Sequence, residues 1–167
     1  MIALYLPQPL SQNFLQNERG LNLTQIGQLI AMRSVGLVVL NLGLGQINAR
    51  LGFLLAQVGM ALFSLILWQG TNMLWYSVGY FLLGSYQTCR SLAIAQGRSL
   101  IQTARMGLGY GMIETAMTSA VMIAPPLAGL IYAQNPVWIY PISIVLIAAA
   151  LLVSILFSPI KSTDIHM

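Results

Sequence analysis

Three ionisable residues, Arg33, Arg90 and Glu114, stand inside long apolar stretches of the sequence. A charge in hydrocarbon costs about 2.5 kcal/mol or more on insertion scales, so such residues usually face a protein interior or a wet cavity. At a helical rise of about 1.5 Å per residue, Arg33 lies roughly 14 Å deep, near the midplane, and Arg90 and Glu114 lie roughly 8 and 10 Å from the opposite side. Arg90 and Glu114 therefore share a level and can pair, whereas Arg33 has no acidic partner at its depth in this chain.

Each of these residues has more than one interpretation. Arg90 either reaches the headgroups or pairs with Glu114, and Glu114 either neutralises Arg90 alone or also lines a cavity. Arg33 either pairs with a carboxylate elsewhere in a larger protein or binds an anionic group of a solute, for which its forked donors are suited. The polar residues near these charges either line a pathway or form hydrogen bonds between helices. The cavity candidates are Arg33, Tyr86, Gln87, Tyr110, Glu114 and Thr118, and Arg90 with Glu114 is the candidate structural ion pair.

Enzyme chemistry finds little support in the sequence. The one cysteine, Cys89, lies in an apolar run, and the one histidine, His166, is next to the end of the chain. There is no Ser/His/Asp set, no spacing typical of metal ligands and no pair of neighbouring carboxylates. We therefore predict no catalytic residues, no metal site and no cofactor.

The composition predicts that lipid is the solvent for most of the surface. Hydrophobic residues make up 57% of the chain, charged residues only 6%, and the mean hydropathy is +0.79. Soluble domains usually carry about 25% charged residues. The net charge of +4 comes from basic residues too scattered for a nucleic-acid patch. We expect the lipid bilayer as a partner, and no nucleic acid.

The apolar stretches predict an all-α membrane protein, because lipid offers the backbone no hydrogen-bond partner. Residues 1–16 are expected to be the end of a truncated transmembrane helix. Residues 17–160 are expected to form a bundle of five full transmembrane helices, and residues 161–167 a cytoplasmic tail. The predicted spans cover residues 24–46, 51–69, 74–95, 107–132 and 137–157. The second and fifth spans carry no charge and are suited to face lipid.

Charges in the loops predict the orientation of these spans. One set of alternate loops holds Arg50, Arg98, Arg105 and Lys161, with Asp164, whereas the other set holds only Arg19, with Glu18. Basic residues favour the cytoplasmic side. We therefore predict a multi-pass protein of the cell membrane with its C-terminus in the cytoplasm.

The fourth span has two further features. Gly107 and Gly111, and then Ala116, Ala120, Ala124 and Ala128, repeat every four residues, a spacing that lets helices approach closely. Pro125 and Pro126 lack an N–H and clash with the preceding turn, so we expect a kink there.

Several short motifs resemble those of the major facilitator superfamily of transporters. The stretch Gly45-Gln46-Ile47-Asn48-Ala49-Arg50-Leu51-Gly52 is similar to the family's G-x-L-x-D-R-x-G loop, with Ala49 in place of the acidic residue. Arg105-Met106-Gly107-Leu108-Gly109 resembles the entry to the eleventh family helix. Ala124-Pro125-Pro126-Leu127-Ala128-Gly129 resembles a G-P-x-x-G signature in that helix.

The resemblance implies half of a major-facilitator bundle, from the end of helix 7 to helix 12. In that family the eighth, tenth and eleventh helices line the cavity, and the ninth and twelfth face lipid. The expected function is that of a fragment of a secondary active transporter, which moves a small solute by alternating access together with a missing N-terminal half. The alternative is a free-standing small membrane protein that acts as an oligomeric scaffold or channel.

Overall fold

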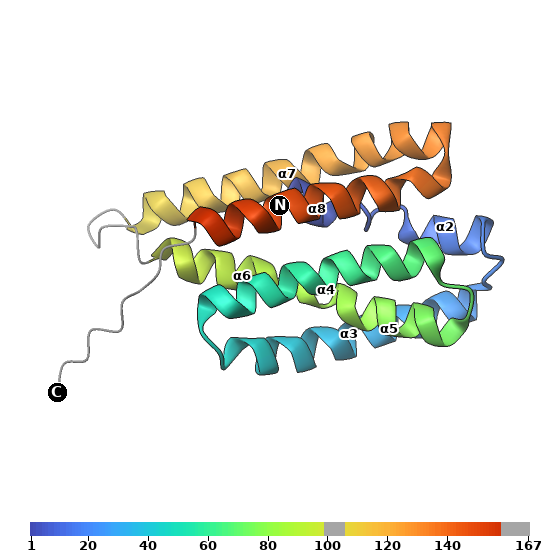
Figure 1. The fold of residues 1–167 in the computed structure, drawn as a ribbon, viewed down its shortest axis with the longest axis horizontal. Helices are drawn as coiled ribbons and strands as arrows, with labels where there is room; N and C mark the ends of the chain where they lie inside the picture. Colours follow the sequence, from blue (N-terminus) through green and yellow to red (C-terminus); the bar gives the residue numbers. More distant parts are fainter. Residues whose placement is uncertain (99–105, 158–167) are drawn as a thin grey trace.

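The computed structural model describes residues 1–98 and 106–157, and within them every regular element is a helix. The longer helices run along the long axis of the molecule, and in this view the N-terminus lies near the middle of that axis (Figure 1). The predicted cytoplasmic tail, residues 161–167, lies outside the described residues. The helices are α1 (Ile2–Tyr5), α2 (Ser11–Asn17), α3 (Leu23–Gly45), α4 (Ala49–Gln69), α5 (Met73–Leu83), α6 (Ser85–Arg98), α7 (Met106–Gln134), the 3₁₀ turn η2 (Pro136–Trp138) and α8 (Ile139–Phe157).

Local sequence explains how the chain enters α3. Gly20 adopts a positive φ of 69°, which costs glycine little, and thereby ends the turn that follows α2. Asn22 then caps α3: its Oδ1 accepts from the N–H of Gln25 at 2.8 Å, and the Gln25 Oε1 accepts from the N–H of Asn22 at 2.9 Å. This reciprocal pair satisfies two of the free donors at the start of the helix.

Four helices in the described part of the chain are long and apolar enough to cross a membrane: Leu23–Gly45, Ala49–Gln69, Gly107–Gln134 and Pro136–Leu156. Their outer faces carry large apolar side chains. On α4 these form one stripe, Leu51, Leu55, Val58, Leu62 and Leu65, with a helical spacing of three to four residues. Exposed apolar surface of this extent fits a membrane-embedded protein.

The span predicted over residues 74–95 is instead two helices, α5 and α6, which meet at Gly84. The N–H of Gly84 donates to the carbonyl of Phe81, three residues back, at 3.1 Å, so the helix tightens locally. Ser85 then donates from its hydroxyl to the carbonyl of Ala56 on α4, at 3.0 Å. The interruption therefore coincides with close contacts to other helices, and neither half alone reaches the length of a span.

The first residues also differ from the single helix end expected over residues 1–16. They form the short helices α1 and α2, separated by turns that contain Pro7 and Pro9. Each proline removes an N–H donor and disfavours a helical conformation of the residue before it. Within the bundle, α1 packs against α4, α7 and α8.

A close helix crossing lies between α3 and the end of α5 at Gly84. A Cβ added to Gly36 would meet the carbonyl of Phe81, and one added to Gly84 would meet the backbone of Gly36 and Leu37. Two glycines thus let the two backbones touch, as small residues commonly do at helix crossings in membranes.

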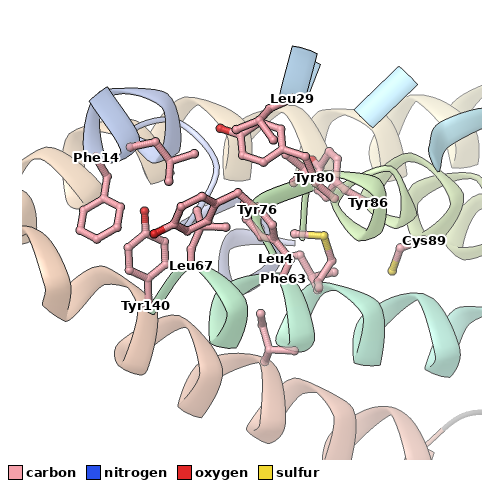
Figure 2. Close-up of a cluster of buried hydrophobic side chains, with 14 of the residues drawn as sticks. Leu4, Phe14, Leu29, Phe63, Leu67, Tyr76, Tyr80, Tyr86, Cys89 and Tyr140 are labelled. Carbon is pink, nitrogen blue, oxygen red and sulfur yellow. The ribbon is translucent and has the colours of Figure 1, made fainter. Parts of the chain in front are cut away.

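Tyrosines are a main component of the core (Figure 2). Tyr76, Tyr80 and Tyr140 are at most 2% exposed. The Tyr76 hydroxyl donates to the carbonyl of Gly70 at 2.6 Å, and the Tyr80 hydroxyl donates to the Ser11 Oγ at 3.2 Å. Because the hydroxyls of Tyr76 and Tyr80 have partners, these two rings are buried without leaving their polar groups unsatisfied.

Burial divides the helices differently from the predicted division by charge. Of the four long helices, α4 is the most buried, because it packs against α5, α6 and α8, and its exposed residues are the apolar stripe and the C-terminal Trp68 and Gln69. The least buried is α3, and α7 and α8 also leave much of their surfaces exposed. The surface of α4 that is free to face lipid is therefore mainly one stripe and not the whole helix.

Candidate functional site

Arg33 lies on the packed face of α3. The buried residues of this helix are Ile26, Leu29 and Gly36, and Arg33 falls within the same stripe at helical spacing. Its side chain is half-buried and lies within electrostatic reach of the hydroxyls of Tyr80 and Tyr86. Among the described residues, the Arg33 guanidinium has no hydrogen bond and no ion pair. It is thus a bundle-facing cation with unused donors.

Arg90 on α6 and Glu114 on α7 form an ion pair through Nη2 and Oε1. The side chains are 32% and 47% exposed, so the pair lies at the edge of the bundle and not in its core. Arg90 and Glu114, for which the sequence predicts a similar depth in the membrane, are therefore in contact. The pair joins α6 to α7, which otherwise meet over a small area.

Tyr86 lies between the two arginines. Its side chain is only 4% exposed, and both the Arg33 and the Arg90 guanidinium groups act electrostatically on its hydroxyl. The ring of Tyr5 from α1 packs against it, with centroids 5.5 Å apart and planes tilted by 50°. Figure 2 shows Tyr86 beside Tyr80 at one end of the tyrosine cluster. The site therefore combines two cations, one carboxylate and aromatic rings from several helices.

One hydrogen bond between Thr88 and Asn41 fixes the register of α6 against α3. The Thr88 Oγ1 donates to the Asn41 Oδ1 at 2.7 Å, and Thr88 is only 1% exposed. Since α3 and α5–α6 run in the same direction, Arg90 lies about ten residues further along the register than Arg33, which is on the order of 15 Å. Arg33 and Arg90 thus stand at two depths with Tyr86 between them.

The other cavity candidates are spread more widely. Gln87 and Tyr110 are half-buried, whereas Thr118 is exposed. Thr118 shares a shallow groove with Glu114 on the outer face of α7, and Gly111, Thr115, Ser119 and Met122 complete its lining. Among the candidates, Arg33, Tyr86 and Glu114 with its partner Arg90 thus form a connected set. Within the described residues, no hydrogen bond or ion pair joins Gln87, Tyr110 or Thr118 to it.

The loop motif is held by contacts at two of its three residues. Arg50 donates from Nη2 to the carbonyl of Ile155 near the end of α8, at 3.0 Å. A Cβ on Gly52 would lie 2.8 Å from both the Leu44 carbonyl and the Leu92 Cδ1, whereas one on Gly45 would meet nothing within 4 Å. Arg50 and Gly52 thus have packing roles, and Gly45 has none that the structure shows.

Pro125 and Pro126, where the sequence predicts a kink, lie inside α7, and the helix continues through both of them. Their missing N–H groups leave the carbonyls of Val121 and Met122 without the usual helical donors.

The start of α7 carries the motif that resembles a helix entry, residues 105–109, and its Arg105 lies outside the described residues. On the predicted small-residue face, Ala120, Ala124 and Ala128 are buried, whereas Ala116, Gly107 and Gly111 are exposed.

Sequence reasoning missed two polar contacts. Arg19 donates from Nη2 to the carbonyl of Trp68 at the end of α4, at 3.0 Å, and stacks over the Phe14 ring at 5.4 Å. Gln57, only 2% exposed, donates from Nε2 to the Ser154 Oγ at 3.0 Å and joins α4 to α8. A glutamine inside an apolar span was the available signal for the second contact.

No protein-family profile, no curated protein and no solved structure matches this chain.

Proposed function

We propose that this chain is part of a secondary active transporter of the major facilitator superfamily and contributes to a site for a small solute with an anionic group. In this proposal α3, α4, α7 and α8 are four spans. The segment α5–Gly84–α6 is a fifth, interrupted span, since residues 73–98 reach roughly 39 Å at helical rise. A second six-helix half completes the pathway, and the two halves alternate access to a site near the midplane.

The observation that carries the proposal is the state of Arg33. It lies in the middle of an apolar helix, faces the bundle, and has no hydrogen bond or ion pair within the described residues. A guanidinium at such a depth needs a partner. A carboxylate or phosphate on a solute is the partner that its planar fork fits best.

The proposed orientation puts the α3–α4 turn and the end of α8 on the cytoplasmic side of the cell membrane, with the C-terminus. Arg50 stands at that end of the bundle, where its contact with Ile155 joins α4 to α8. The positive-inside rule favours this arrangement.

Substitution of Arg33 tests the proposal in the protein that carries this chain. Arg33→Gln is expected to weaken solute binding about tenfold or more, because a hydrogen bond to a charged group is lost, while thermal stability stays close to that of the parent. Arg33→Lys should restore binding only partly, because an ammonium keeps the charge but loses the fork. If Arg33→Gln abolishes folding, and removal of an acidic charge elsewhere in the protein restores it, Arg33 is a structural partner and the proposal is wrong.

The outer face of α7 favours a second candidate function, an oligomeric scaffold or channel. Gly107, Gly111 and Gly129 have nothing within 4 Å of an added Cβ, so this face has room for another helix. A stable homo-oligomer of the chain in detergent, disrupted by Gly111→Leu and without anion binding, would favour this function over the transporter.

A further inference from the structure

The charges around Tyr86 do not sum to zero. Arg33 and Arg90 each contribute one positive charge, and Glu114 contributes one negative charge that is already engaged with Arg90. The other elements packed on α7, namely α1, η2 and α8, carry no acidic or basic side chain in their described parts. The net balance of these three side chains is therefore one uncompensated cation, at Arg33.

From this balance we propose that Glu114 determines the charge selectivity of the anion site: by holding Arg90, it leaves one free guanidinium and makes the site select monoanions over dianions. The inference rests on the proposed function, because it assumes that the anion binds at Arg33. Glu114 acts here through Arg90 and not through the solute, so it is a positioning residue.

The geometry of α3, α6 and α7 supports this role. The Thr88–Asn41 hydrogen bond fixes α6 against α3, so Arg90 stands on the order of 15 Å further along the helices than Arg33. Both side chains are long, and both act electrostatically on the same Tyr86 hydroxyl. An elongated solute with a charge at each end would place one group at each arginine, but only if Arg90 were released from Glu114.

Hexanoate and adipate are matched probes for this idea, because they share a six-carbon chain and differ by one carboxylate. Binding is measured by calorimetry on the full protein in lipid nanodiscs, with thermal unfolding as a check of the fold. The parent protein should bind hexanoate more tightly than adipate. Glu114→Gln frees Arg90 and should shift the affinity ratio toward adipate by about tenfold or more, since a charged hydrogen-bond partner is gained. Arg90→Gln with Glu114→Gln should restore the original ratio.

Glu18→Gln is the matched control, since it removes an exposed carboxylate at the opposite end of the bundle and should leave the ratio unchanged. A folded Glu114→Gln variant with the parent ratio, or an equal shift in Glu18→Gln, overturns the inference. If Glu114→Gln does not fold, Arg90→Gln serves instead: its net charge of zero should weaken hexanoate, and adding Glu114→Gln should recover it. Failure of that recovery also overturns the inference. If the parent binds neither probe, the proposed anion site itself is wrong.

Discussion

Four arginine side chains in the described part of the chain, Arg19, Arg33, Arg50 and Arg90, meet three kinds of environment. Arg19 and Arg50 donate to main-chain carbonyls near the C-terminal ends of α4 and α8, where the free carbonyls and the helix dipole favour a cation. Arg90 has a carboxylate partner, and Arg33 has neither kind of partner. The same residue type therefore serves helix ends, a helix–helix link and the candidate site.

At the residue scale, a double-mutant cycle tests the Arg90–Glu114 pair. Either Glu114→Gln or Arg90→Gln alone should destabilise the protein, because each leaves a charge in an apolar environment without its partner. Removing both should be milder than the sum of the single effects. Because both side chains are partly exposed, we expect a coupling energy on the order of 1 kcal/mol. Thermal or chemical unfolding in detergent measures it, and additive single effects would show that the pair does not interact.

At the element scale, the glycine crossing of α3 and α5 makes steric demands that a single helix does not reveal. The spacing of residues 74–95 predicts one continuous span, yet the chain tightens at Gly84, where α3 lies directly against it. Hydrophobic periodicity reports the exposed and buried faces of one helix, whereas the break depends on a neighbour more than forty residues away in the sequence.

Gly36→Ala is the corresponding prediction. Its methyl group would collide with the carbonyl of Phe81, so the helices must separate, which typically costs about 1–3 kcal/mol. The matched control is Gly43→Ala on the same helix, where a Cβ meets nothing within 4 Å and stability should stay the same or rise slightly. The midpoints of thermal unfolding of the two variants are measured in detergent, and Gly36→Ala should have the lower one. Equal midpoints would contradict the close crossing.

At the scale of the whole molecule, the sequence predicted the helical class. It also predicted, to within a few residues, four helices that are long and apolar enough to cross a membrane. Apolar runs bounded by polar turns suffice for this, because only a helix satisfies its own backbone in lipid. Depths estimated from the helical rise per residue also predicted that Arg90 and Glu114 could pair. It did not predict that α4 would be the most buried of the long helices, because an uncharged helix suits both lipid and a packed interior.

The same rules predict the topology, which cysteine labelling of intact cells can measure. In a Cys89→Ala background, a cysteine at Asn72 or Asn135 should react with a membrane-impermeant maleimide from outside. A cysteine at Asn48, exposed in the α3–α4 turn, should react only after permeabilisation. The expected difference follows from the bias of basic residues toward one set of loops. Labelling of the Asn48 cysteine in intact cells would reverse the proposed orientation.

The contact between Gly36 and Gly84 has a mechanical consequence. Gly36 divides α3 into arms of roughly 20 and 14 Å, and no side chain lies between the two backbones at that point. Any tilt of α3 about this point moves its two ends in opposite directions, and the longer arm moves further. Arg33 lies one turn from the pivot, so it would hardly shift while the helix ends swing: the crossing acts as a fulcrum with the free guanidinium beside it.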